Sequence, residues 1–116
     1  MSSTSPLTPP SAIISKVALH QGAAVIAKLQ FVYVVGGTWH HVDGTTDIPL
    51  GGTVVVDPGQ FGVPEGAQFQ PYVFVVWGSD PQVQPVFTYQ REAPLTATFT
   101  LTGTALVNSV ALDSIA

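Results

Sequence analysis

Hydrophobic and polar residues alternate along most of the chain after residue 11. In the segment 23–35 the apolar side chains fall on one face, while Lys28 and Gln30 fall on the other. The segment 95–102 is more regular still, because every second residue is a threonine and the residues between are apolar. Successive side chains of a strand point to opposite faces of the sheet, so this alternation predicts strands with one face on a core.

The other predicted strands are separated by short segments rich in glycine, proline and aspartate, such as Gly51-Gly52 and Asp57-Pro58-Gly59, which are typical of turns. These strands are expected near residues 13–20, 38–42, 53–57, 67–77, 83–90 and 104–112. Seven or eight short strands with little or no helix predict an all-β domain. We expect an antiparallel β-sandwich, with a flattened barrel as the alternative. The predicted core contains Leu29, Phe31, Phe69, Val73, Val75, Phe99 and Leu101.

The chain is predicted to hold one domain over residues 12–116. Residues 1–11 are almost entirely serine, threonine and proline, a composition that packs poorly, so a flexible arm is expected there. This start lacks the basic and apolar regions of a signal peptide. No stretch approaches the roughly 20 apolar residues of a membrane helix. The compartment stays unknown from the sequence.

The composition is apolar and poor in charge, with 46% hydrophobic and 9% charged residues and a net charge of −4. Three basic residues cannot neutralise a phosphate track, so nucleic-acid binding is excluded. The same scarcity gives no support to attraction by anionic lipid, although membrane contact stays open. The absence of cysteine excludes disulfides, thiolate catalysis and a cysteine-based zinc site. A neutral partner fits this acidic chain best.

Two predicted strands carry apolar side chains on both faces, although a sandwich buries only one face of each sheet. The five residues on the leftover face are Val32, Val34, Tyr72, Phe74 and Val76. A cluster of large apolar residues is rarely left in water, and few charges resist association. We therefore predict a homo-oligomer interface at these residues. Residues 1–14 folding back over the patch is the competing interpretation.

Each of the two tryptophans lies beside a turn, where a flat ring is able to stack on the apolar face of a sugar. Trp39 with His41 and Asp43 is the first predicted ligand site. Trp77 with Asp80, completed by Tyr89 or Gln82, is the second. For Trp77, which ends an apolar strand, burial in the core is the stronger interpretation.

Catalysis and metal binding find no clear motif. His40 and His41 are adjacent on a predicted strand, so their side chains point to opposite faces. This leaves His41, Asp43 and Asp47 as the residues that could bind one ion together. Three ligands are too few to predict a metal site. No serine lies in a Gly-x-Ser-x-Gly turn, although a carboxylate pair stays open. We predict that the chain is not an enzyme and binds no cofactor.

In size, low charge and all-β character the chain resembles the small lectins and the aegerolysin-type sandwich proteins of fungi and bacteria. No motif is shared residue by residue, so no site is transferred from them. We predict a non-catalytic, lectin-like binding module that forms homo-oligomers and recognises a neutral surface ligand such as a glycan. The alternatives are a structural protein that self-assembles into a coat or fibre, and a lytic sandwich protein that contacts membranes.

Overall fold

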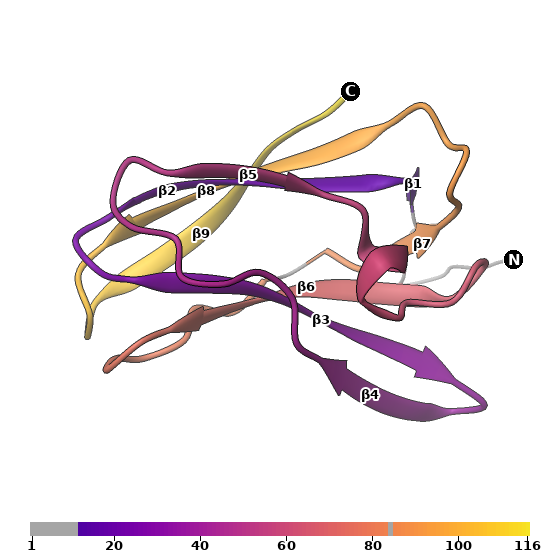
Figure 1. Ribbon diagram of the computed structural model, residues 1–116, viewed down its shortest axis with the longest axis horizontal. Helices are drawn as coiled ribbons and strands as arrows, with labels where there is room; N and C mark the ends of the chain where they lie inside the picture. The colour runs from indigo at the N-terminus through magenta and orange to yellow at the C-terminus, as the bar shows by residue number, and fades with distance from the viewer. Residues whose placement is uncertain (1–11, 84) are drawn as a thin grey trace, which may run out of the picture.

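A computed structural model describes residues 12–83 and 85–116, so the predicted arm 1–11 lies outside the described residues. Two sheets pack face to face, as Figure 1 shows, which confirms the all-β sandwich. The first sheet contains, in spatial order, β1 (Ala12–Ile14), β7 (Phe87–Tyr89), β6 (Gln68–Val75), β3 (Ala27–Val35) and β4 (Thr38–Val42). The second contains β5 (Thr53–Val56), β2 (Lys16–Ala23), β8 (Thr96–Gly103) and β9 (Asn108–Ile115). A single turn of 3-10 helix, η1 (Pro58–Phe61), follows β5.

The described residues form nine strands, whereas eight segments were predicted. The additional strand arises at Ser15, which divides the predicted strand 13–20 into β1 and β2. The buried Ser15 donates its backbone N–H to the carbonyl oxygen of Leu95 at 3.0 Å. The chain changes sheet at this residue, because β1 pairs with β7 and β2 pairs with β8.

Both of these pairs are parallel, whereas the other ladders are antiparallel, as expected from the sequence. In the second sheet, Lys16 to Ala23 of β2 align with Thr96 to Gly103 of β8. Parallel partners need a long connection between them. The alternation of apolar residues specifies which face of a strand is buried but carries no information about the direction of its neighbour.

The core lies between the sheets and is built from the inward side chains of both. All seven predicted core residues are buried, together with the aromatic residues Phe87 and Tyr89 of β7. The Phe69 ring lies 6.0 Å from Phe31 and 6.0 Å from Phe87, and Phe87 contacts Phe99 of the second sheet edge-on at 6.1 Å. Each such buried side chain contributes roughly 1.5–3 kcal/mol. This aromatic cluster therefore holds the two sheets together.

One buried polar residue organises the connections near the end of the core. Gln21 of β2 has no exposed surface, and its Nε2 donates to the carbonyl oxygens of Val25 at 2.6 Å and Ile48 at 3.3 Å. Its Oε1 accepts a hydrogen bond from the Ala23 N–H at 2.6 Å. The side chain therefore fastens the β2–β3 turn to the segment that precedes β5.

Candidate functional site

Three loops meet at one end of the sandwich, on the left of Figure 1. They are the β2–β3 turn (residues 24–26), the segment after β6 (residues 76–79) and the β8–β9 turn (residues 104–107), which we call the loop end. Ala24 donates its N–H to Gly103 at 3.0 Å, Val76 donates to Ile26 at 2.9 Å, and Ser79 donates to Ala105 at 2.8 Å. These backbone bonds join the three loops into one surface.

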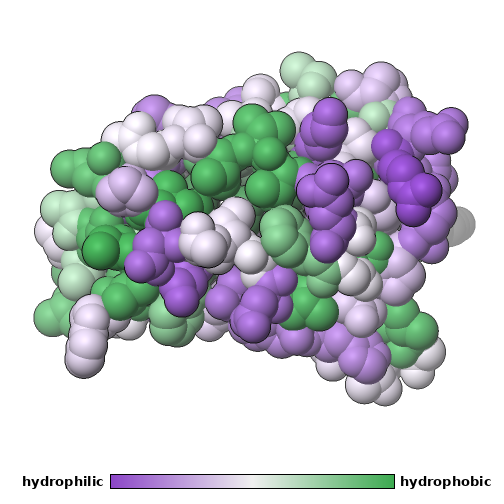
Figure 2. Space-filling model, viewed as in Figure 1, coloured by the Kyte–Doolittle hydropathy of each residue, from purple (hydrophilic) through white to green (hydrophobic). Residues whose placement is uncertain are grey.

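The loop end exposes large apolar side chains. Trp77 is 94% exposed, Val107 77%, Leu106 75% and Ile26 44%. None of the residues of the loop end is charged. Figure 2 shows hydrophobic surface gathered at this end, while hydrophilic residues gather at the opposite end. A contiguous apolar surface rimmed by polar groups commonly marks an interaction site.

The backbone directs Trp77 into solvent. Trp77 has a φ of 61° and is the one non-glycine residue with positive φ in the part of the chain that is described. This conformation costs roughly 1–2 kcal/mol for a residue with a side chain, so the surrounding structure must impose it. The exposure corrects the interpretation of Trp77 as a core residue, because the turn after β6 carries the ring outside the sheet.

Two neighbours fix this turn. A Cβ on Gly78 would lie 2.3 Å from the Ala105 carbonyl oxygen, so only glycine permits the close approach of the two loops. The Asn108 Nδ2 donates to the carbonyl oxygens of Ser79 and Thr104, both at 2.9 Å. The turn that carries Trp77 is therefore held by hydrogen bonds from the Asn108 side chain and from the Ser79 N–H to the Ala105 carbonyl oxygen.

Leu106 and Val107 were missed as site residues because the segment 104–112 was predicted to be a strand. In the structure β9 begins only at Asn108, and residues 104–107 form the preceding turn. Two consecutive large apolar residues between Thr104 and Asn108 interrupt the alternation. That interruption, beside the turn residue Gly103, was the available signal.

The second predicted ligand site does not form as a unit. The Asp80 carboxylate accepts hydrogen bonds from the Val75 N–H at 2.8 Å and from the Tyr72 hydroxyl. The bond from Tyr72 and the burial of its ring raise the pKa of the Tyr72 hydroxyl. Gln82 is exposed, whereas Tyr89 is buried in the core with its hydroxyl donated to Asp57. Trp77 thus belongs to the loop end, whereas the Asp80 carboxylate is hydrogen-bonded to Tyr72 and Val75 of β6.

The first predicted site lies on the outer face of the first sheet. Trp39 and His41 share that face of β4, where they lie opposite Val34 and Val32 of β3. Trp39 is 55% exposed. The His41 Nε2 lies 2.7 Å from the Gln30 Oε1, and the His41 ring lies 4.7 Å from the Tyr72 ring. Gln30 and Tyr72 were not predicted, because they come from strands whose register the sequence does not show.

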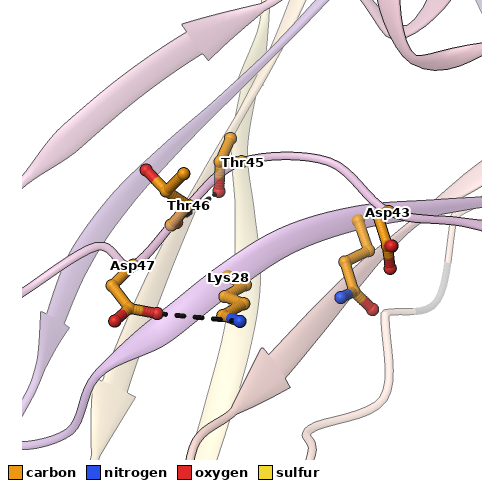
Figure 3. A pocket seen from close by; sticks show the side chains of 6 residues that line it. Lys28, Asp43, Thr45, Thr46 and Asp47 are labelled. Carbon is orange, nitrogen blue, oxygen red and sulfur yellow. Dashed lines mark hydrogen bonds and ion pairs between the residues drawn. The ribbon is translucent and has the colours of Figure 1, made fainter.

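Asp43 follows β4 and lines a shallow hollow of about 540 Å³. The other residues that line it are Lys28, Gln30, Thr45, Thr46 and Asp47. Figure 3 shows Lys28 directed toward Asp47, with Nζ and Oδ1 3.8 Å apart, and Asp43 on the other side of Lys28. A Cβ on Gly44 would lie 2.0 Å from the Leu29 carbonyl oxygen, so glycine allows this segment to lie against β3.

The five residues of the predicted oligomer interface share the outer face only in part. Val32 and Val34 lie opposite Gln70 and Gln68 of β6. Tyr72 and Phe74 lie opposite Gln30 and Lys28 of β3, and Val76 lies in the loop end. Polar side chains therefore divide the apolar residues into separate groups, and the interface stays a prediction.

A metal site finds no geometric support. His40 points away from His41 and stacks on Tyr33, with ring centroids 5.1 Å apart. Across residues 12–83 and 85–116, no three histidine, aspartate or glutamate side chains are grouped closely enough to hold an ion.

Within the same described ranges, no helix has the length and apolar character needed to cross a bilayer.

Comparison with known sequences finds no matching family model and no matching curated protein. Comparison with solved structures finds the membrane-binding domain of pneumolysin, with a TM-score of 0.52 and 11% identity over 86% of this chain and 96% of that domain. Intermedilysin, solved with human CD59, matches with a TM-score of 0.52 and 9% identity, and the chain spans only 24% of its length. At these identities the likeness is one of fold. The chain thus shares the two-sheet β-sandwich fold of that membrane-binding domain.

Proposed function

We propose that this protein is a non-catalytic module that docks on a lipid surface through its loop end. The observation that carries the proposal is the uncharged loop end, which exposes Trp77 to 94%, Val107 to 77% and Leu106 to 75% on joined loops. This proposal takes up membrane contact, which the sequence analysis gave as an alternative, and does not include lysis.

The chemistry of the loop end suits the boundary between headgroups and acyl chains. Tryptophan combines a large apolar ring with a polar N–H and is enriched at membrane interfaces. Transfer of large apolar side chains such as Leu106 and Val107 out of water contributes roughly 1.5–3 kcal/mol each. The N–H groups of Val76 and Ser79 bond within the loop end, so they would keep their partners on insertion.

The charge of the protein indicates which lipid headgroups it would bind. The loop end contains no lysine or arginine, and the whole chain has a net charge of −4. Apolar contact must therefore supply the affinity, and we expect binding to zwitterionic vesicles with little dependence on salt. The pneumolysin domain that shares the fold over 96% of its length is named for membrane binding, which supports this proposal by analogy.

Vesicles of pure phosphatidylcholine provide the test. We expect the full chain to co-sediment with them, and the Trp77→Ala and Leu106→Ser variants to bind about tenfold more weakly, which corresponds to about 1.4 kcal/mol. Trp39→Ala is the matched control, because it removes the same ring from the other surface. In a Trp39→Phe variant, the fluorescence of Trp77 should shift to shorter wavelength when vesicles are added.

The proposal is wrong if the full chain stays in the supernatant with these vesicles. It is also wrong if Trp39→Ala abolishes binding while Trp77→Ala retains it. A steep loss of binding in high salt would replace apolar docking with electrostatic adsorption.

We also infer that self-association is a second candidate function, on the evidence of β9. This strand has eight residues, only Asp113 among them is charged, and within the described residues it pairs on one side only, with β8. A long, weakly charged edge strand offers unpaired backbone groups to a second copy of the chain. Light scattering tests this by giving the mass of the particle in solution. The Ala111→Lys variant, at an exposed position of β9, should be a monomer if the wild type is a dimer formed through β9. A monomeric wild type would contradict self-association.

A further inference from the structure

The outer face of the first sheet is chemically different from the loop end, and membrane docking does not use it. The strand β3 runs from the loop end toward the β3–β4 turn at the other side of the molecule (Figure 1). This face carries aromatic rings and polar side chains, together with Val32, Val34 and Lys28. The aromatic rings are Trp39, Tyr72 and Phe74, and the polar groups are Gln30, His41, Gln68 and Gln70.

Hydrogen bonds already orient the polar groups at the centre of this face. Asp80 accepts from the Tyr72 hydroxyl, the Tyr72 ring contacts His41, and His41 bonds to Gln30. These four residues come from β3, β4, β6 and the segment after β6. A polar ligand would therefore meet groups whose positions are fixed before it binds, which lowers the entropic cost of binding.

Beside this network lies the hollow of about 540 Å³ lined by Gln30, Asp43 and the threonines 45 and 46. Its one cation, Lys28, lies 3.8 Å from Asp47, and the second carboxylate, Asp43, leaves the hollow with one excess negative charge. Amide, hydroxyl and carboxylate groups suit the hydroxyls of a ligand without net charge. Phosphate and other anions find no unpaired cation among the residues that line it.

Trp39 provides the apolar element that a saccharide requires. The ring is 55% exposed and lies on the same face of β4 as His41. Four residues of extended chain span about 13 Å, so a ligand that reaches both Trp39 and Asp43 must be longer than a single sugar.

We propose that this face binds a neutral oligosaccharide, which stacks on Trp39 and places its hydroxyls against His41, Gln30 and the hollow at Asp43. This site is separate from the loop end, and the proposal goes beyond membrane docking. A soluble glycan and the carbohydrate part of a glycolipid offer the same chemistry, so the test separates them by the presence of lipid.

The experiment begins with the labelled full chain on an array of neutral oligosaccharides in the absence of lipid, followed by calorimetric titration with the strongest soluble binder. We expect Trp39→Ala to weaken that binding about tenfold, since an aromatic contact contributes about one factor of ten. Gln30→Ala should weaken it as well, and it serves as the second variant if Trp39→Ala alters the fold. Trp77→Ala is the matched control and should leave saccharide affinity unchanged.

Binding at the outer face is overturned if no neutral oligosaccharide on the array exceeds background. It is also overturned if the Trp39→Ala and Gln30→Ala variants, shown to be folded by circular dichroism, bind as the wild type does. Loss of saccharide binding in Trp77→Ala alone would move the site to the loop end. Because the titration contains no lipid, its outcome is independent of vesicle binding, and addition of glycolipid vesicles to the wild type then tests the second source.

Discussion

The loop end and the outer face of the first sheet each present one exposed tryptophan, but they are ordered in different ways. At the loop end, hydrogen bonds between backbone groups and from Asn108 fix the loops, and the side chains that project are apolar. On the sheet face, the backbone belongs to regular strands, and the side chains of Tyr72, His41 and Gln30 bond to one another or to Asp80. The loop end therefore exposes apolar side chains that can be transferred out of water. The sheet face holds polar side chains in fixed positions for a polar ligand.

The two tryptophans illustrate how context decides the use of one residue type. Trp39 lies in a paired strand, and its neighbours across the ladder fix its direction. Trp77 lies one turn beyond its strand, and a positive φ turns it outward. The chemistry of a tryptophan is therefore set by the backbone that carries it, and four substitutions or conditions test this contrast, from the largest expected effect to the smallest.

The largest effect is expected for Gln21→Leu, because Gln21 supports both regions. Loss of its amide removes the hydrogen bonds to the Val25 carbonyl and the Ala23 N–H, whereas the Ile48 carbonyl keeps its bond from the Ala27 N–H at 3.1 Å. An unsatisfied buried polar group costs about 1–3 kcal/mol, so we expect the free energy of unfolding to fall by about 3 kcal/mol. Urea denaturation measures the change, with exposed Gln82→Leu as the control. A loss similar to that of the control would show that the amide is not needed.

The next effect is expected for Gly44→Ala, which acts on the sheet face. The new Cβ would lie 2.0 Å from the Leu29 carbonyl oxygen, so residues 43–47 must move away from β3. Such overpacking costs about 1–3 kcal/mol. We expect lower stability and weaker saccharide binding, with vesicle binding retained. Gly66→Ala, whose new Cβ meets nothing within 4 Å but whose φ is +82°, measures the cost of backbone strain without close approach and should leave saccharide binding unchanged. Equal losses of saccharide binding in the two variants would contradict a role for the close approach at Gly44.

A somewhat smaller loss of stability is expected for Gly78→Ala, which acts on the loop end. Its Cβ would lie 2.3 Å from the Ala105 carbonyl oxygen, and these loops have more room to shift than a central strand. We expect a stability loss of about 1 kcal/mol and weaker vesicle binding, because the loop of Trp77 must move away from the loop of Ala105. Gly36→Ala, at a positive φ without close neighbours, should leave vesicle binding unchanged. Vesicle binding that survives in both variants would show that the loops need not be joined.

The smallest effect concerns Tyr72 at alkaline pH. The hydrogen bond to Asp80 raises the pKa of Tyr72 above its ordinary value of 10.0, so the folded state holds this proton more tightly than the unfolded state does. The resulting stability is complete below pH 10.0 and is lost as the pH rises through the raised pKa. We expect the urea midpoint to fall less above this pH in Tyr72→Phe than in the wild type.

Tyr72→Phe should still lose some stability at alkaline pH because of Tyr89. The pKa of Tyr89 is raised mainly by burial and also by its hydrogen bond to Asp57. A Tyr89→Phe variant is therefore the matched comparison. If the wild type and Tyr72→Phe lose stability equally on alkaline titration, the bond between Tyr72 and Asp80 does not contribute.

The strands and the core could be predicted because each depends on local alternation. Leu29, Phe31 and Phe99 are buried as expected, since a period of two assigns each residue to a face without knowledge of its partners. The same rule placed Trp39 and His41 together. Gln30 and Tyr72 escaped prediction because their positions depend on the register between β3, β4 and β6. The loop end escaped because residues distant in sequence meet there, and because the turn at Trp77 ends a run of apolar residues that resembles a buried strand.

The parallel pairing of β2 with β8 also has a consequence for how this chain reaches its native state. Ser15 and Leu95, which bond where these strands begin, are separated by 80 residues. The centre of the second sheet therefore cannot assemble until β8 is present, and closing so long a loop carries an entropic cost before any contact stabilises it. Small domains dominated by such distant pairings fold in milliseconds to seconds rather than microseconds. During that interval the apolar strand β6 and the edges of the first sheet are open to other chains, so aggregation competes with folding until β8 docks.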